Sequence, residues 1–129
     1  MAELTRNQSL VVEALRRADG PLSAYSILDK LRNDGFRAPL QVYRALDKLM
    51  DMGLVHRLES LNAFVACAHP DHDHDHHAII GFAICDACGQ VDEFHDEQIG
   101  ERLGEWGRKS GFHADKTTIE IRGRCKACI

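Results

Sequence analysis

Apolar residues recur at helical spacing in three stretches of the N-terminal half of the chain. The first stretch, residues 4–21, stops at Gly20 and Pro21. The second, residues 22–35, has Ser23 as its expected N-cap and ends at Gly35, and the third, residues 38–53, has Pro39 in its first turn. Each stretch has an apolar stripe. In the first stretch it consists of Leu10, Val11, Ala14, Leu15 and Ala18. In the second it consists of Ile27, Leu28 and Leu31, and in the third of Val42, Leu46, Leu49 and Met50. The pattern predicts three amphipathic helices.

Two short runs of β-type residues follow the third helix. They flank the turn-like segment 59–62 and predict a hairpin over residues 54–67. Three helices and a hairpin within this length are the layout of a winged helix. This is a variant of the helix-turn-helix in which the later helix enters the major groove of DNA.

The polar face of the third helix carries the candidate DNA contacts, Gln41, Tyr43, Arg44 and Lys48, together with Asp47. Periodicity alone suits a helix of a small bundle with a solvated face equally well. A tyrosine beside an arginine, however, offers phosphate and base-edge contacts that a merely soluble helix does not need. With the hairpin, this pair favours DNA binding.

The C-terminal half predicts a small α/β module. Strands are expected at 78–85, 89–94 and 117–125, and a helix at 96–111 would turn Ile99, Leu103 and Trp106 inward and end at Gly111. The sheet would have open edges that pairing with a second copy would bury. The predicted fold class is α+β, with a winged helix-turn-helix over 1–66, a hinge over 67–78 and an α/β domain over 79–129.

Length and charge narrow the class of protein. A chain of 129 residues holds one ordinary domain or two very small ones. A very small domain usually needs a cross-link, such as a disulfide or a bound metal ion, to be stable. The net charge is -4, but the acidity belongs to the C-terminal half and leaves the other half near neutral. No stretch reaches the roughly 20 apolar residues of a membrane span. Because the N-terminus also lacks the features of a signal peptide, we expect a soluble, cytoplasmic protein.

Four of the five cysteines form two C-x-x-C pairs that bracket the C-terminal module: Cys85, Cys88, Cys125 and Cys128. In a chain without an export signal, this pattern favours metal thiolates over disulfides. Four thiolates around one tetrahedral Zn²⁺ make a closed structural site, which can contribute about 10–16 kcal/mol to folding. A redox pair or packed cysteines are alternatives, but two pairs at opposite ends of the module favour structural zinc.

The fifth cysteine, Cys67, directly precedes a tract of alternating aspartate and histidine. A lone cysteine is often a small buried hydrophobe. Cys67 could also join His56, one histidine of the tract and an acid such as Glu93 in a mixed zinc site. Such a site is weaker than four thiolates and therefore more readily emptied and refilled, as a sensor requires.

The tract at residues 69–77 has two interpretations. Alternating aspartate and histidine is compatible with a solvated linker whose histidines bind metal loosely or not at all. A specific role is expected for one or two histidines at the C-terminal end, beside the apolar strand. His76 and His77 are therefore preferred over His69, His72 and His74.

These stretches together resemble the ferric-uptake-regulator superfamily of bacterial metal-dependent repressors, and most closely its zinc-uptake branch. The resemblance rests on "LSAYSILDKLR", "PLQVYRALDKLMDMGLVHRLES", "AFVAC", "ICDACGQVDEF" and "CKAC", which follow in family order and cover nearly the whole chain. It implies a homodimer with a winged helix, a dimerisation module, structural zinc on the paired cysteines and a regulatory site at the hinge.

The resemblance also implies which residues hold the regulatory zinc. They are His56, Cys67, Glu93 and His77, with His76 as a substitute for His77, so that each chain holds two Zn²⁺. The thiolate of Cys67 favours zinc over iron or manganese. A further site of many relatives uses a histidine on the last strand and is expected to be absent, because residues 115–123 contain no histidine.

The sequence thus predicts a zinc-responsive repressor that binds double-stranded operator DNA as a metal-loaded homodimer and controls zinc uptake genes. Tyr43 and Arg44 would read bases, with Gln41 beside them, while Lys48, Arg57 and Arg37 are candidates for phosphate contacts. An iron-, manganese- or peroxide-responsive regulator of the same fold is one alternative, and a zinc-buffering protein without DNA binding is another. No catalytic constellation is evident, so an enzyme is not expected.

Overall fold

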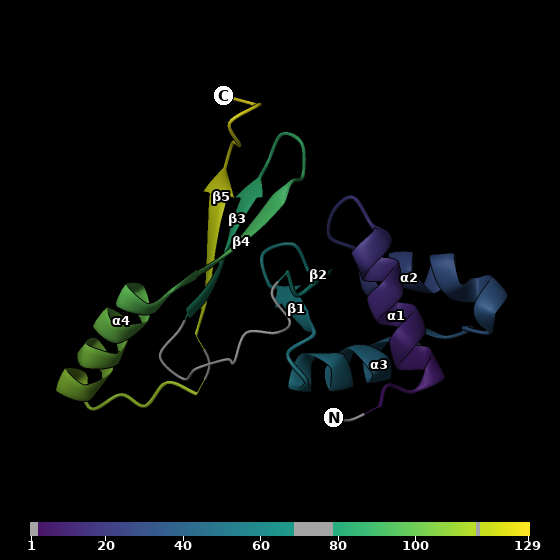
Figure 1. The fold of residues 1–129 in the computed structure, drawn as a ribbon, viewed down its shortest axis with the longest axis horizontal. Helices are drawn as coiled ribbons and strands as arrows, with labels where there is room; N and C mark the ends of the chain where they lie inside the picture. Colours follow the sequence, from purple (N-terminus) through teal and green to yellow (C-terminus); the bar gives the residue numbers. More distant parts are fainter. Residues whose placement is uncertain (1–2, 69–78, 116) are drawn as a thin grey trace. The chain divides into compact units, whose positions relative to one another are not determined.

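The computed structural model describes residues 3–68, 79–115 and 117–129, and the chain divides into two compact units, Met1–Pro70 and Asp71–Ile129 (Figure 1). The predicted α+β fold class is confirmed: three helices and a hairpin form the first unit, and a three-stranded sheet with one helix forms the second. No helix within the described ranges is long and apolar enough to cross a membrane.

The helices of the first unit begin where local capping groups satisfy their free N–H groups. In α1 (Arg6–Arg17), Thr5 and Gln8 form a capping box, with Gln8 donating its N–H to the Thr5 hydroxyl oxygen at 3.2 Å. Helix α2 (Ala24–Leu31) has the predicted N-cap, Ser23, which accepts a hydrogen bond from the Ser26 N–H at 3.1 Å. A short 3₁₀ helix, η1 (Arg32–Asp34), extends α2 as far as Gly35.

The apolar stripes of α1, α2 and α3 (Pro39–Asp51) meet in one core, as predicted. The strands β1 (Val55–Leu58) and β2 (Ala63–Ala66) pair antiparallel and form the predicted hairpin, which we call the wing. Leu22 pairs with Phe64 and joins the start of α2 to the wing through two backbone hydrogen bonds of 2.8 and 3.0 Å. The wing is therefore anchored to the helices through its second strand.

The second unit is built on a sheet of order β4-β3-β5. Its central strand β3 (Ile79–Cys85) pairs antiparallel with β4 (Val91–Asp96) and parallel with β5 (Thr118–Gly123), and α4 (Glu97–Ser110) connects the two outer strands (Figure 1). Phe82 and Ile84 of β3 are buried. Both β4 and β5 are edge strands of this sheet, as the sequence predicts.

The predicted orientation of α4 is wrong. Ile99, Leu103 and Trp106 share one face of the helix, but their exposed fractions are 37%, 42% and 59%, and only Gly107 of α4 is buried. The periodicity correctly indicates an apolar face, whereas burial depends on whether another surface covers that face. We call these three residues the α4 stripe. The helix ends at Gly111 as predicted, with φ of 72°.

Candidate metal and DNA-binding sites

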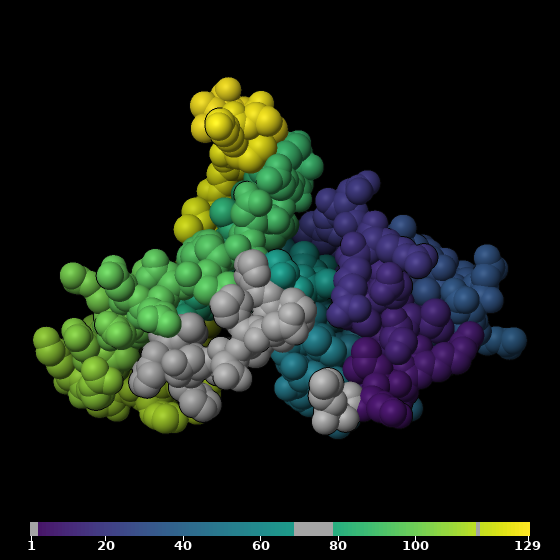
Figure 2. All heavy atoms as spheres, in the orientation of Figure 1, coloured from purple at the N-terminus to yellow at the C-terminus, as the bar shows by residue number. Residues whose placement is uncertain are grey.

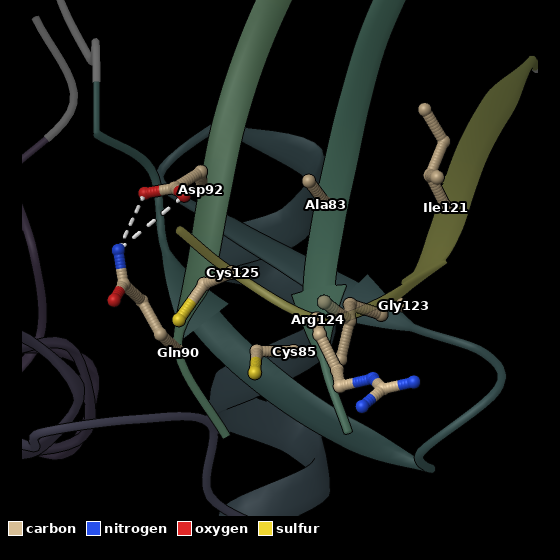
Figure 3. Close-up of a pocket in the computed structure, with 9 residues that line it drawn as sticks. Ala83, Cys85, Gln90, Asp92, Ile121, Gly123, Arg124 and Cys125 are labelled. Atoms are coloured by element: carbon tan, nitrogen blue, oxygen red, sulfur yellow. Dashed lines mark hydrogen bonds between the residues drawn. The ribbon is translucent and has the colours of Figure 1, made fainter. Parts of the chain in front are cut away.

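Four cysteines that lie far apart in the sequence come together in the second unit. Cys85 ends β3, Cys88 follows in a turn, and Cys125 and Cys128 lie in the turn after β5. Because β3 and β5 run parallel with Cys85 opposite Gly123, both C-x-x-C turns leave the same end of the sheet. Figure 3 shows the Cys85 and Cys125 side chains close together, and Figure 2 shows the yellow C-terminal residues packed against the green turn after β3.

The spacing of the four sulfur atoms suits a tetrahedral metal ion. All four lie within 4.8 Å of one another, and the Sγ atoms of Cys88 and Cys125 are 3.7 Å apart. Zn–S bonds of about 2.3 Å in a tetrahedron place sulfur atoms roughly 3.8 Å apart. Geometry and donor type therefore fit Zn²⁺. We call these residues the four-cysteine cluster.

Electrostatics within the four-cysteine cluster also favour a cation. Hydrogen bonds from the backbone N–H groups of Cys125 and Cys88 lower the pKa of the Cys85 thiol to about 6. Hydrogen bonds with the side chains of Cys125, Cys85 and Cys88, together with desolvation and the charge of Cys125, raise the pKa of Cys128 to about 12. The Cys85 thiolate therefore forms readily while the raised pKa values of Cys88 and Cys128 oppose ionisation, whereas a divalent cation would stabilise all four thiolates.

An ion pair that the sequence did not predict links the two cysteine turns. Arg122 donates to Asp86 Oδ1 through Nη2 at 2.7 Å and Nε at 3.0 Å, and the Asp86 N–H donates to the Gly123 carbonyl at 2.7 Å. Asp86 lies inside the first C-x-x-C motif and Arg122 on β5. Beside the cluster, a hollow of about 110 Å³ is lined by residues that include Ile121 and Asp92 (Figure 3).

Two of the predicted regulatory ligands lie together in the first unit. His56 is on β1 opposite Val65, and Cys67 is buried just after β2, where its N–H donates to the Leu54 carbonyl at 2.8 Å. The ligand atoms of His56 and Cys67 are within 4.8 Å of each other. Strand pairing in the wing therefore places an imidazole beside a thiol.

The third predicted ligand, Glu93, lies on β4 of the second unit opposite Phe82. Its Oε2 atom is 2.9 Å from Nε2 of His95, two residues further along the same strand. Alternate residues of a strand share a face, so this pairing could have been anticipated, although His95 was not among the predicted site residues. The predicted ligands His76 and His77, and the tract residues His69, His72 and His74, lie outside the described residues.

The predicted DNA contacts fall mainly on the outer face of α3. The Tyr43 side chain is 37% exposed, and Arg44 and Lys48 of the same helix are exposed as well. Gln41 is half-buried in the first turn of α3.

Two further candidate contacts lie outside the helix. On the wing, Arg57 donates from Nη2 to Asn62 Oδ1 at 2.9 Å, and its Nε is 3.7 Å from Glu59 Oε2. Arg37 precedes α3 and donates its backbone N–H to the Gln41 side chain.

Comparison with known proteins places this arrangement in a family. Residues 2–122 match the model of the ferric uptake regulator family. Over 127 residues, the chain is 38% identical to the zinc uptake regulation proteins of Escherichia coli (strain K12) and of Shigella flexneri, a match that covers 98% of this chain and 72% of each relative.

Two solved structures resemble the whole chain. One is a zinc uptake regulator complexed with zinc and DNA, which is 35% identical with a TM-score of 0.90 and coverage of 98% of this chain and 83% of that one. The holo form of XcZur is 39% identical, with a TM-score of 0.87 and coverage of 97% and 85%. Fold, cysteine cluster and relatives together define a regulator of transcription rather than an enzyme. The chain belongs to the ferric uptake regulator family.

Proposed function

We propose that this protein is a zinc-responsive transcriptional repressor that binds operator DNA. The main support is the 38% identity to zinc uptake regulation proteins across nearly the whole chain, together with a cysteine set suited to zinc. The similar structure that holds zinc and DNA agrees with this function. As a DNA-binding regulator, the protein would act in the compartment that contains the DNA.

In this proposal each chain holds two zinc ions. The four-cysteine cluster, formed by Cys85, Cys88, Cys125 and Cys128, would hold a structural ion, since four thiolates leave no open coordination position. His56, Cys67, Glu93 and His77, with His76 as a substitute, would hold a regulatory ion. Bound zinc would supply a cross-link between groups that belong to separate parts of the chain.

The role of His95 follows from its contact with Glu93. A histidine that hydrogen-bonds to one oxygen of a metal-binding carboxylate fixes the orientation of that carboxylate, and the other oxygen remains able to bind the metal. His56 and Cys67 offer a nitrogen and a sulfur from the wing. A mixed set of this kind suits zinc and binds it less firmly than four thiolates do.

We place a winged-helix domain at 1–66, a hinge at 67–78 and a dimerisation domain at 79–129. Zinc at the regulatory site would tie the wing to the dimerisation domain and select one arrangement of the two winged helices of a homodimer. A coupling free energy of about 1–3 kcal/mol would raise operator affinity about 5–150-fold. The two α3 helices would then meet half-sites about one DNA turn apart.

Homodimer formation is supported by apolar surface in the second unit. The α4 stripe is exposed, Phe112 is exposed beside Trp106 with ring centroids 5.8 Å apart, and β4 and β5 are sheet edges. Isolated apolar residues on a surface are common, but a contiguous group on one helix points to an interaction surface. A second copy would cover it symmetrically.

DNA contacts are assigned by chemistry and position. Tyr43 and Arg44 would reach base edges from α3, and Lys48 would contact a phosphate. Arg57, which donates a hydrogen bond to Asn62 on the wing, would contact the backbone of an adjacent DNA segment. Arg37, just before α3, is a weaker candidate for a phosphate.

The decisive experiment is the selection of bound DNA from a random pool, carried out with zinc and again with a chelator. We expect one palindromic sequence with zinc and none without it. Cys67→Ser should retain the structural zinc but lose zinc-dependent selection, which matched metal analysis of both proteins would check. DNA selection that is independent of zinc would contradict the metal response. Several loosely bound zinc ions with no DNA selected would indicate a zinc buffer instead.

A further inference from the structure

Gln41 has a structural role in α3 that restricts how it can contact DNA. It occupies the third position of the helix, and its Oε1 accepts hydrogen bonds from the backbone N–H groups of Arg37 at 2.7 Å and Ala38 at 3.1 Å. The N-cap residue, Ala38, has no side-chain oxygen with which to cap the helix. Gln41 therefore satisfies backbone donors at the start of α3 that would otherwise lack a partner.

These two hydrogen bonds also fix which way the amide points. A backbone N–H can only donate, so the atom that faces Arg37 and Ala38 must be the carbonyl oxygen and the Nε2 group must lie on the other side. An sp² oxygen has two lone pairs, and both are used here. Within the part of the chain that the structure describes, Nε2 has no assigned acceptor. The Nε2 group of Gln41 can therefore donate a hydrogen bond to DNA, whereas its Oε1 atom cannot accept one.

The position of Gln41 suits contact with a base. Gln41, Arg44 and Lys48 recur at spacings of three and four residues, so they share one face of α3. Residues near the N-terminus of a recognition helix lie closest to the base edges. A free glutamine in the major groove pairs with adenine through one donor and one acceptor, at N7 and N6. This pairing with adenine requires the side-chain oxygen, which in Gln41 already accepts the two backbone hydrogen bonds at the start of α3.

We propose that Gln41 reads DNA as a donor only, and that it selects a base with a major-groove acceptor, guanine at O6 or N7, thymine at O4 or adenine at N7, against cytosine, whose major-groove edge carries only an amino donor. This inference rests on the proposed function, because it assumes that α3 enters the major groove. A single neutral hydrogen bond corresponds to about a three- to tenfold preference at one base position in each half-site.

The test is Gln41→Glu in the full-length, zinc-loaded protein. A carboxylate can accept the same two backbone hydrogen bonds, as glutamate does in a capping box, but it has no donor. We expect an unchanged thermal midpoint and zinc content, with cytosine, which offers an amino donor and no acceptor, changing from a disfavoured to a favoured base at one position of each half-site. The added negative charge would lower affinity for all sequences alike, so the base preference is the informative readout.

Gln41→Ala is the matched variant, since it removes both the cap and the donor. It should flatten the preference at that same position and also lower the thermal midpoint. A wild-type preference for cytosine at the position that responds to these substitutions would overturn the proposal, as would unchanged preferences at every position in Gln41→Glu. If wild-type protein selects no sequence with zinc, the proposed function itself fails and this inference fails with it.

Discussion

At the scale of single residues, Gly81 is tightly constrained by its neighbour across the sheet. It lies on β3 opposite Phe94, and the ring of Phe94 covers its Cα. A Cβ atom built on Gly81 would lie 2.1 to 2.6 Å from three ring atoms of Phe94. This distance is far below van der Waals contact, so the close approach of the ring requires glycine.

We predict that Gly81→Ala destabilises the second unit by about 1–3 kcal/mol, because the Phe94 ring must leave its position or the strands must separate. Urea unfolding followed by circular dichroism would measure this change. Gly123→Ala is the matched control at the end of β5, where no heavy atom of a described residue lies within 4 Å of the added Cβ. Equal effects of the two substitutions would contradict the assigned contact.

At the scale of elements, local sequence signals determine where the helices of the first unit begin. Thr5, Ser23 and Pro39 mark the starts of α1, α2 and α3. The predicted N-cap at Ser23 and the predicted Pro39 in the first turn are both confirmed. These signals act within three or four residues, so they can be recognised without knowledge of the tertiary structure. The cap formed by Gln41 was not predicted, since glutamine on a polar face was assigned to DNA contact alone.

We predict that Thr5→Ala lowers the free energy of unfolding of the first unit by about 1 kcal/mol. The threonine oxygen accepts the Gln8 N–H, and alanine would leave that donor without its partner. Ser9→Ala on the exposed side of the same helix is the control, and should be neutral or slightly stabilising because alanine has the higher helix propensity. Thermal unfolding of the two variants beside wild type would distinguish the cap from a general effect of removing a hydroxyl. Equal losses in both variants would count against the capping box.

At the scale of the whole molecule, the exposed α4 stripe is the feature that a single chain leaves incomplete. The spacing of Ile99, Leu103 and Trp106 indicates an apolar face, yet the chain's own second unit does not bury it. The sheet beside it has two edge strands. Both features are explained if the stable form is an assembly of two chains.

We predict that Trp106→Glu converts a dimer into a monomer and weakens zinc-dependent DNA binding, because a buried carboxylate at the centre of an apolar interface is strongly unfavourable. Sedimentation equilibrium would give the oligomeric state. Arg108→Glu introduces an acid on the opposite side of the same helix and should leave the dimer intact. A dimer that persists in Trp106→Glu would exclude the α4 stripe as its interface.

The two proposed zinc sites should differ in how readily they lose metal. A weak chelator is expected to remove one zinc per chain and abolish operator binding with little change in circular dichroism. A strong chelator should remove the second zinc and unfold the C-terminal unit, because four thiolates hold the metal that supports its small core. Metal analysis of the protein after each treatment would test this order. Release of both ions in a single step would contradict the assignment of separate structural and regulatory sites.

The sequence by itself determined the positions of the helices, the wing and the two cysteine pairs. It also indicated the family through "VYRALD" and the paired "CDAC" and "CKAC" motifs. Each of these features depends on residues that are close along the chain, or on ligand types that few other functions require. The polar face of α3 could likewise be proposed as the DNA-contacting surface before its surroundings were known, because that proposal uses only residue types and their helical spacing.

The tertiary structure decided what depends on residues distant in sequence. Parallel pairing of β3 with β5 brings Cys85 and Cys88 to Cys125 and Cys128, and the same pairing joins Asp86 to Arg122. The fold also left the α4 stripe exposed, where periodicity alone implied burial. An apolar stripe indicates only that burial of one helix face would be favourable. Whether that face is buried depends on the other surfaces of the same chain, or of a second chain, that can pack against it.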